Sequence, residues 1–151
     1  MSLKIASRTY YSFSEYKGNV KSIDSIDGNG IVIPEGFVSI GSIYRSAGMI
    51  IPDTVISIGE IYYSSLIIPA SVESISKIKG SGDRGNDEIK ITISLKSKIP
   101  PMIGSIVDLS RFDSLMVPQG ALNAYKNHPI WGKFKNILEN PRLNSLTPNT
   151  T

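Results

Sequence analysis

SIDSI at 22–26, SIGSI at 39–43, SIGEI at 57–61 and SISKI at 74–78 are four copies of one phrase, a serine–isoleucine pair with a second isoleucine three residues on. The steps between copies are 17, 18 and 17 residues. An aliphatic run closed by proline keeps the same spacing, and it ends at Pro34, Pro52, Pro69 and, after a longer gap, Pro118. Repeats of this length are typical of a solenoid, in which each coil buries its apolar face by stacking on its neighbours.

The composition favours strands in these coils. The 151 residues include 24 isoleucines and 22 serines against 9 leucines, and β-branched residues suit a pleated, half-buried surface. Counted from each proline, positions −3, −1, +3, +6 and +9 are apolar in every coil, which predicts that they face the core. They are Ile31, Ile33, Phe37, Ile40, Ile43, Met49, Ile51, Val55, Ile58, Ile61, Leu66, Ile68, Val72, Ile75 and Ile78, with Val20, Ile23 and Ile26 in a partial first coil. The predicted fold class is mainly β, a short-coil leucine-rich-repeat or β-solenoid with a C-terminal helical cap.

The solenoid is predicted to form a single domain over residues 1–139, because a chain of this length fits one core. The repeats occupy 20–117. Residues 79–88 interrupt them with a stretch that has no apolar side chain, so we expect an exposed loop insertion. Residues 1–19 are expected to form an N-terminal cap, because an open terminal coil would expose both core and strand edge.

The C-terminal end is predicted to be capped by helix. After Pro118 the apolar spacing changes from that of a strand to that of a helix, which predicts a helical cap over 118–139. The apolar members are Leu122, Tyr125, Trp131, Phe134, Ile137 and Leu138. Residues 140–151, NPRLNSLTPNTT, are predicted to be a flexible tail.

Charge and composition argue against several classes of function. The net charge is +3 and the basic residues are scattered, so we expect no nucleic-acid partner. The chain has no cysteine, which excludes disulfides, thiolate metal sites and cysteine nucleophiles. It has no apolar run of 18 residues, so membrane insertion is not expected. Residues 1–20 also lack the basic segment and apolar stretch of a secretory signal peptide.

Catalytic and cofactor signals are weak. His128 is the single histidine and has no second histidine with which to bind a metal, so a structural role is expected. The glycines of the SIG phrases are expected to be isolated turn residues rather than a phosphate loop. Glu35 and Asp53 share position +1 of neighbouring coils, close to the ~5 Å carboxylate separation of retaining glycosidases, but two solvated turn acids explain the same pattern. We therefore expect no enzyme activity, no cofactor and no metal.

Two parts of the chain resemble a known family. IPEGFVSIGSI at 33–43 and IPDTVISIGEI at 51–61 resemble the repeat of BspA-type leucine-rich-repeat proteins, and ITISLKSKIPPMIG with SLMVPQGALNAYKNHPIWGKFKNILE resembles the family's C-terminal end. The resemblance covers about residues 30–139. It implies a surface or secreted protein of Bacteroidetes and related bacteria, with roles in adhesion and protein binding. Coils of 17 or 18 residues are shorter than the usual ~20–29, and the family's aromatic-Gly-Cys stretch after SIG is missing.

An aliphatic column is the first candidate binding surface. Strand alternation turns position −2 outward, where the side chains are Val32, Ile50, Ile67 and Met116, and position +4 adds Val38 and Ile56. A solvated face ordinarily carries polar residues, so this column predicts a contact surface for another molecule or for a second copy of the chain. The alternatives are that the N-terminal segment, the inserted loop or the tail covers it, or that these are ordinary exposed aliphatics.

Tyrosines form the second candidate. Tyr44 and Tyr62 share position +10 and are expected to stack on adjacent coils, with Tyr63 and Arg45 beside them. Rows of aromatic side chains hold sugars or peptides, and an arginine next to them pairs with a carboxylate. The alternative is that these tyrosines pack a corner of the solenoid with their hydroxyls in water.

Two functions from different classes follow. The first is a non-enzymatic binding module that recognises a protein or glycan through the outer solenoid face, located extracellularly or at the cell surface as the family resemblance implies. The second is a structural subunit of a larger assembly, such as a bacteriophage virion, in keeping with the missing export signal and the aliphatic outer column.

Overall fold

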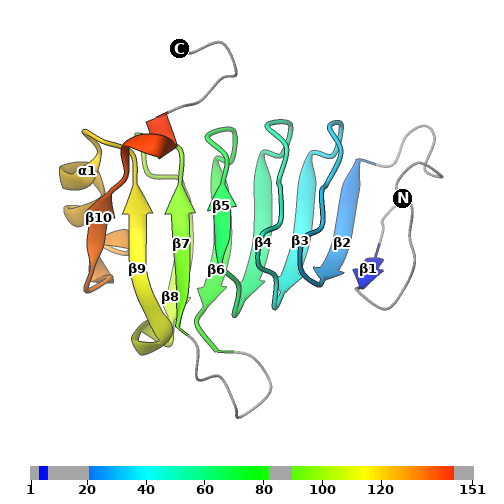
Figure 1. The fold of residues 1–151 in the computed structure, drawn as a ribbon, viewed down its shortest axis with the longest axis horizontal. Coiled ribbons are helices and arrows are strands. Elements are labelled where there is room, and N and C mark those ends of the chain that lie inside the picture. The colour runs from blue at the N-terminus through cyan, green and yellow to red at the C-terminus, as the bar shows by residue number, and fades with distance from the viewer. Residues whose placement is uncertain (1–3, 7–20, 82–89, 145–151) are drawn as a thin grey trace.

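The computed structural model describes residues 4–6, 21–81 and 90–144. Most of the predicted N-terminal cap, most of the predicted loop insertion and the end of the predicted tail lie outside these residues. The described chain forms a parallel β-solenoid of about 6 turns, which confirms the predicted mainly β solenoid fold. Figure 1 shows the coils stacked side by side along the long axis of the molecule.

Over residues 22–117, each coil contributes one segment to each of two sheets. The first sheet has six parallel strands, in the order β1 (Lys4–Ala6), β2 (Ser22–Asp27), β3 (Ser39–Tyr44), β4 (Ser57–Tyr62), β6 (Ser74–Lys79) and β8 (Met102–Val107). The second sheet has four, in the order β5 (Leu66–Ile68), β7 (Ile91–Leu95), β9 (Phe112–Val117) and β10 (Ile137–Glu139). A parallel bridge between Val32 and Ile50 continues the second sheet toward the first coils. The strands of the two sheets run in opposite directions (Figure 1).

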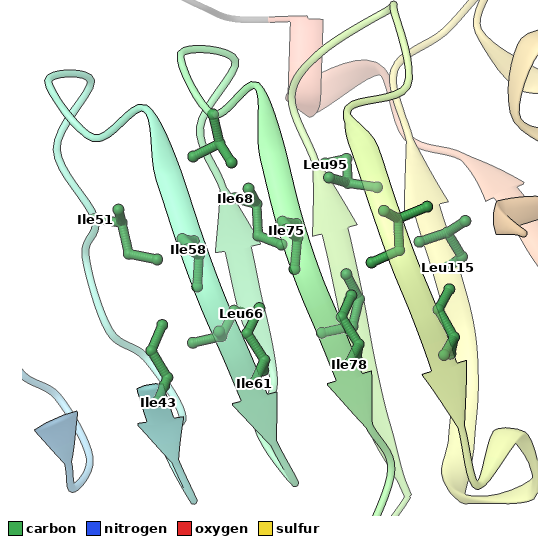
Figure 2. Close-up of a cluster of buried hydrophobic side chains, with 14 of the residues drawn as sticks. Ile43, Ile51, Ile58, Ile61, Leu66, Ile68, Ile75, Ile78, Leu95 and Leu115 are labelled. Carbon is green, nitrogen blue, oxygen red and sulfur yellow. The ribbon is translucent and has the colours of Figure 1, made fainter. Parts of the chain in front are cut away.

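The serine–isoleucine phrases are the strands of the first sheet, and like residues stand in line. Ile40 pairs with Ile58 and Ile58 with Ile75, and the serine that precedes each isoleucine pairs with the serine of the next coil. These isoleucines meet the inward side chains of the second sheet, such as Leu66 and Ile68, in a core that runs the length of the solenoid (Figure 2). Burying one such side chain contributes about 2 kcal/mol. The repetition of this ladder is why neighbouring coils stabilise each other.

The predicted inward positions are confirmed over the described residues with one exception. Every one of them is buried apart from Ile31, which is partly buried against the core, and Val20 lies outside the described residues. The period of the repeat therefore identifies the core of residues 23–78, whereas the buried residues from Ile91 onward lie beyond it. It does so because parallel in-register stacking places equivalent residues of successive coils on top of one another.

The glycines of the SIG phrases lie inside strands, so the expectation that they are turn residues is wrong. Gly41 is in β3 and Gly59 in β4. The pairing of these strands passes from Ile40–Ile58 to Ser42–Glu60 and skips both glycines. A Cβ placed on Gly59 would lie 2.2 Å from the carbonyl oxygen of Gly41. Glycine is favoured here because the backbones of these two coils approach too closely to leave room for a side chain.

The C-terminal end closes the last coils with short helices. After the 3₁₀ turn η2 (Leu109–Arg111) and β9, the chain forms α1 (Leu122–Lys126), the 3₁₀ turn η3 (Trp131–Lys133), β10 and the 3₁₀ turn η4 (Pro141–Asn144). Trp131 is fully buried, and its indole Nε1 donates to the carbonyl oxygen of Pro101 at 2.9 Å. The hydroxyl of Tyr125 donates to the carbonyl oxygen of Ser97 at 2.7 Å, and burial raises the pKa of this hydroxyl. Both bonds hold the cap against the β7–β8 connection.

The structure corrects the C-terminal prediction in two places. Ile137 and Leu138 do not continue a helix, because β10 pairs in parallel with β9 and adds a further strand to the second sheet. The residues that follow are not all tail, since Leu143 in η4 is buried and the side chain of Asn144 accepts a bond from the backbone N–H of Gln119. Residues 145–151 lie outside the described part of the chain.

Candidate functional site

An aliphatic strip lies on the outer face of the second sheet. We define it as Val32, Ile50 and Ile67, which are 57%, 58% and 51% exposed. Val32 and Ile50 pair across a parallel bridge, and Ile67 is the outward residue of β5 in the next coil. The neighbours of each in its own coil, such as Ile51 and Ile68, face inward and are buried. Strand alternation therefore forces these three side chains into solvent while the core is already filled.

Shallow hollows adjoin the strip. One, of about 160 Å³, is lined by Ile50, Ile67 and Lys96 together with the buried residues beneath them. A second, of about 400 Å³, lies along the same two isoleucines and reaches Thr92 and Ser94 of β7. Their floors are mostly aliphatic and their rims carry hydroxyls and one lysine. Such a surface accepts apolar side chains of a partner and lets the rim pair with polar groups around them.

The structure separates Met116 from the strip and adds a residue that the sequence analysis missed. The register pairs Ile67 with Ser94 of β7, Ser94 with Met116 of β9, and Met116 with Leu138 of β10. Ser94 therefore interrupts the aliphatic column between Ile67 and the half-buried Met116. Leu138, 50% exposed, extends the column by one coil. No signal in the sequence points to Leu138, because the apolar spacing of 118–139 also fits a helix.

Val38 and Ile56 belong to a different surface. They directly precede β3 and β4 of the first sheet, on the far side of the corner that follows each proline, and the backbone N–H of Ile56 donates to the carbonyl oxygen of Val38. Ile56 is 43% exposed and Val38 is half-buried. The expectation that they enlarge one apolar sheet face is wrong, because the chain turns between position −2 and position +4.

The predicted tyrosine stack is confirmed. The rings of Tyr44 and Tyr62 are 5.0 Å apart and inclined by only 5°, and the hydroxyl of Tyr62 donates to Glu60 Oε1. The two rings face each other along the solenoid axis, so each covers one face of its neighbour. The stack therefore removes one face of each ring from the flat platform on which a sugar stacks.

Tyr63 and Arg45 stand apart from that stack at a corner. Both adopt left-handed backbone conformations, with φ of 42° and 48°, at equivalent positions of adjacent coils. They line a hollow of about 280 Å³ with Asn29 and Ser65. Beneath them the buried Ser64 hydroxyl accepts from the backbone N–H of Ser46 at 3.0 Å and donates to the carbonyl oxygen of Tyr62 at 2.9 Å.

That buried serine satisfies the backbone where the chain leaves the first sheet. A corner with this bonding is rigid, and the left-handed conformations of Tyr63 and Arg45 follow from the sharp change of direction. The hollow is therefore explained by the turn itself. We place the corner second to the strip as a candidate site.

The remaining candidates are two acidic residues and the single histidine. Glu35 and Asp53 are both exposed at the corners that follow their prolines. His128 accepts hydrogen bonds at Nδ1 from the backbone N–H groups of Ile130 and Trp131, at 3.1 and 3.2 Å, which fixes the start of η3. Among the described residues, no group of three or more histidine, aspartate or glutamate side chains is placed to hold a metal ion. No helix in this part of the chain is long and apolar enough to cross a bilayer.

Comparison with family models, with curated proteins and with solved structures finds no match to this chain. The class of protein is therefore defined by the fold, a short-coil parallel β-solenoid with a helical end.

Proposed function

We propose that this protein is a non-enzymatic binding module that recognises a protein partner through the aliphatic strip. The observation that carries the proposal is the exposure of Val32, Ile50 and Ile67, each more than half exposed on extended, paired backbone. Exposed aliphatic residues aligned on successive coils form one contiguous surface, whereas scattered ones do not. A rigid scaffold holds that surface flat, so binding to it costs little conformational entropy.

A protein suits this surface better than a glycan. Sugars bind on exposed aromatic faces edged by hydrogen-bonding groups, and the ring faces of Tyr44 and Tyr62 are turned toward each other. The strip offers aliphatic carbon and shallow apolar hollows, which match the apolar anchor residues of a protein surface. A glycan ligand at the tyrosine row thus has less support than protein recognition at the strip.

The resemblance of the repeats and of the C-terminal segment to BspA-type proteins supports this proposal and suggests its setting, adhesion at a bacterial cell surface. The second candidate function is a structural subunit of a larger assembly, such as a virion. It is favoured by the regular stacking of the coils side by side along the long axis of the molecule, which gives an assembly an extended side to pack against (Figure 1).

Site-specific photocrosslinking tests the proposal. A benzophenone amino acid replaces Ile67 on the strip or, as the matched control, Ser42 on the first sheet, in cells of the source organism. We expect a discrete protein adduct from position 67 and none from position 42. Absence of any adduct at position 67, or the same adducts from both positions, would show that the strip is not the binding surface.

A further inference from the structure

We propose that the partner of the aliphatic strip is a second copy of this chain, packed face to face on the second sheet with its solenoid axis reversed. This inference rests on the proposed function and names its partner. The two-fold axis lies parallel to the strands, between the coils of Ile67 and Ser94. Two properties of the second sheet support this arrangement, namely its pattern of outward side chains and the charges at its corners, and its size sets the strength of the contact.

The outward column is complementary to its own reverse. From the first coil to the last it carries Val32, Ile50, Ile67, Ser94, Met116 and Leu138. Reversal places Val32 against Leu138 of the second copy, Ile50 against Met116, and Ile67 against Ser94. Four of the six contacts across the two-fold axis are then aliphatic on aliphatic, and the small serine leaves room for the isoleucine opposite.

The charges favour the reversed orientation. Residues 21–81 contain six acidic and four basic side chains, whereas residues 90–144 contain three acidic and eight basic ones. Many of these side chains, such as Asp24, Asp27 and Glu60, belong to the first sheet, so reversal brings together only those at the corners of the second sheet. At the corners it brings the exposed Glu35 toward Arg142, and Asp53 to within one coil of Lys96. With the axes parallel, the strands of the two copies would run in opposite directions across the contact, and neither Glu35 nor Asp53 would lie near these basic side chains.

The size of the face sets the strength of the contact. Six coils at ~4.8 Å span roughly 29 Å, and a three-residue strand is about 10 Å long, so the sheet offers roughly 300 Å² of flat area before the corners are added. Specific interfaces usually bury about 800 Å² per partner. We therefore expect a reversible dimer that forms as concentration rises and dissociates on dilution.

Cysteine crosslinking of the purified full-length chain tests the arrangement, because the native sequence has no cysteine. The variant carries Ile50→Cys with Met116→Cys. Within one chain these positions are three coils apart, roughly 14 Å at ~4.8 Å per coil, too far for a disulfide. In the reversed dimer they lie opposite each other. Mild oxidation should convert the 16.4 kDa chain to twice that mass, and the peptide map should join position 50 of one chain to position 116 of the other.

Two further variants sharpen the result. The matched control carries Ser42→Cys with Ser105→Cys, two positions on the outer face of the first sheet that are also three coils apart. This control should form the covalent dimer at least tenfold more slowly than the strip variant. Ile50→Cys alone should also be slow, because reversal holds the two copies of residue 50 apart. Circular dichroism establishes that each variant is folded, and the mass under reducing conditions shows that the link is a disulfide.

The outcomes separate the inference from the proposed function. Rapid linkage by Ile50→Cys alone would overturn the reversed orientation, because only parallel axes bring the two copies of residue 50 together. Equal rates for the strip variant and the first-sheet control, or a wild-type mass of 16.4 kDa at every concentration, would overturn the second copy as partner. If the benzophenone at position 67 still yields an adduct whose mass differs from that of two chains, the proposed function holds and the partner is a different protein.

Discussion

Substitution of Gly59 by alanine tests how closely the coils are stacked. Gly59 lies in β4, and an added Cβ would be 2.2 Å from the carbonyl oxygen of Gly41 in the preceding coil, where an ordinary contact is 3.4–4 Å. The obstacle is backbone, so no side chain can rotate out of the way. The two strands must separate locally by about 1 Å, which weakens the hydrogen bonds between them.

The expected loss of stability is the sum of three contributions. Overpacking of a filled site costs about 1–3 kcal/mol, and one or two weakened backbone hydrogen bonds add about 1 kcal/mol each. The lower entropy of unfolded alanine offsets roughly 0.4–1 kcal/mol of this. We expect Gly59→Ala to lower the free energy of unfolding by about 3 kcal/mol, which corresponds to a fall in Tm of about 6–12 °C for a chain of this size.

Urea unfolding followed by far-ultraviolet circular dichroism and by the fluorescence of Trp131 measures the effect. Two controls isolate the clash. Ser76 already carries a side chain at the equivalent position in β6, so Ser76→Ala should change stability by less than about 0.5 kcal/mol. Gly48 has φ of +68° and open space around it, so Gly48→Ala should show only the backbone cost of about 1–2 kcal/mol. Equal stability of Gly59→Ala and Ser76→Ala would refute the close approach of the backbones.

Three further predictions concern polar side chains that are bonded to the backbone. Burial raises the pKa of the Tyr125 hydroxyl, so the native state resists ionisation of this group. The resulting stabilisation of the fold is present below pH ~10 and is lost as the pH rises above that value. Tyr125→Phe should reduce this loss of stability at alkaline pH, measured by urea unfolding between pH ~9 and ~11. His128→Ala removes the acceptor of two backbone N–H groups in the cap and should cost about 1 kcal/mol, seen first in the tryptophan fluorescence. Ser64→Ala leaves the buried backbone N–H of Ser46 without its partner and should cost about 1–3 kcal/mol, more than Ser46→Ala does; equal losses would contradict this.

The outer face shows where prediction from sequence stops. Val32, Ile50 and Ile67 could be placed outward because alternation within a strand is local and each residue precedes its proline at a constant offset. That Ser94 comes between Ile67 and Met116 could not, because the insertion at 79–88 breaks the spacing and β7 is not followed directly by proline. Leu138 escaped prediction for a related reason, since an apolar pair near a tryptophan fits a helix as well as a strand.

The repeat alone suffices to predict the solenoid, the strands β2, β3, β4 and β6 and the core of residues 23–78, because in-register parallel stacking turns a constant period into columns of equivalent residues. The surroundings of each column of residues are determined only by the folded chain. There the SIG glycines lie where two backbones approach, Tyr44 and Tyr62 stand face to face, and Ile56 lies around a corner from the strip. These outcomes depend on the path of the turns and on the distance between coils, and neither is encoded in the period of any single repeat.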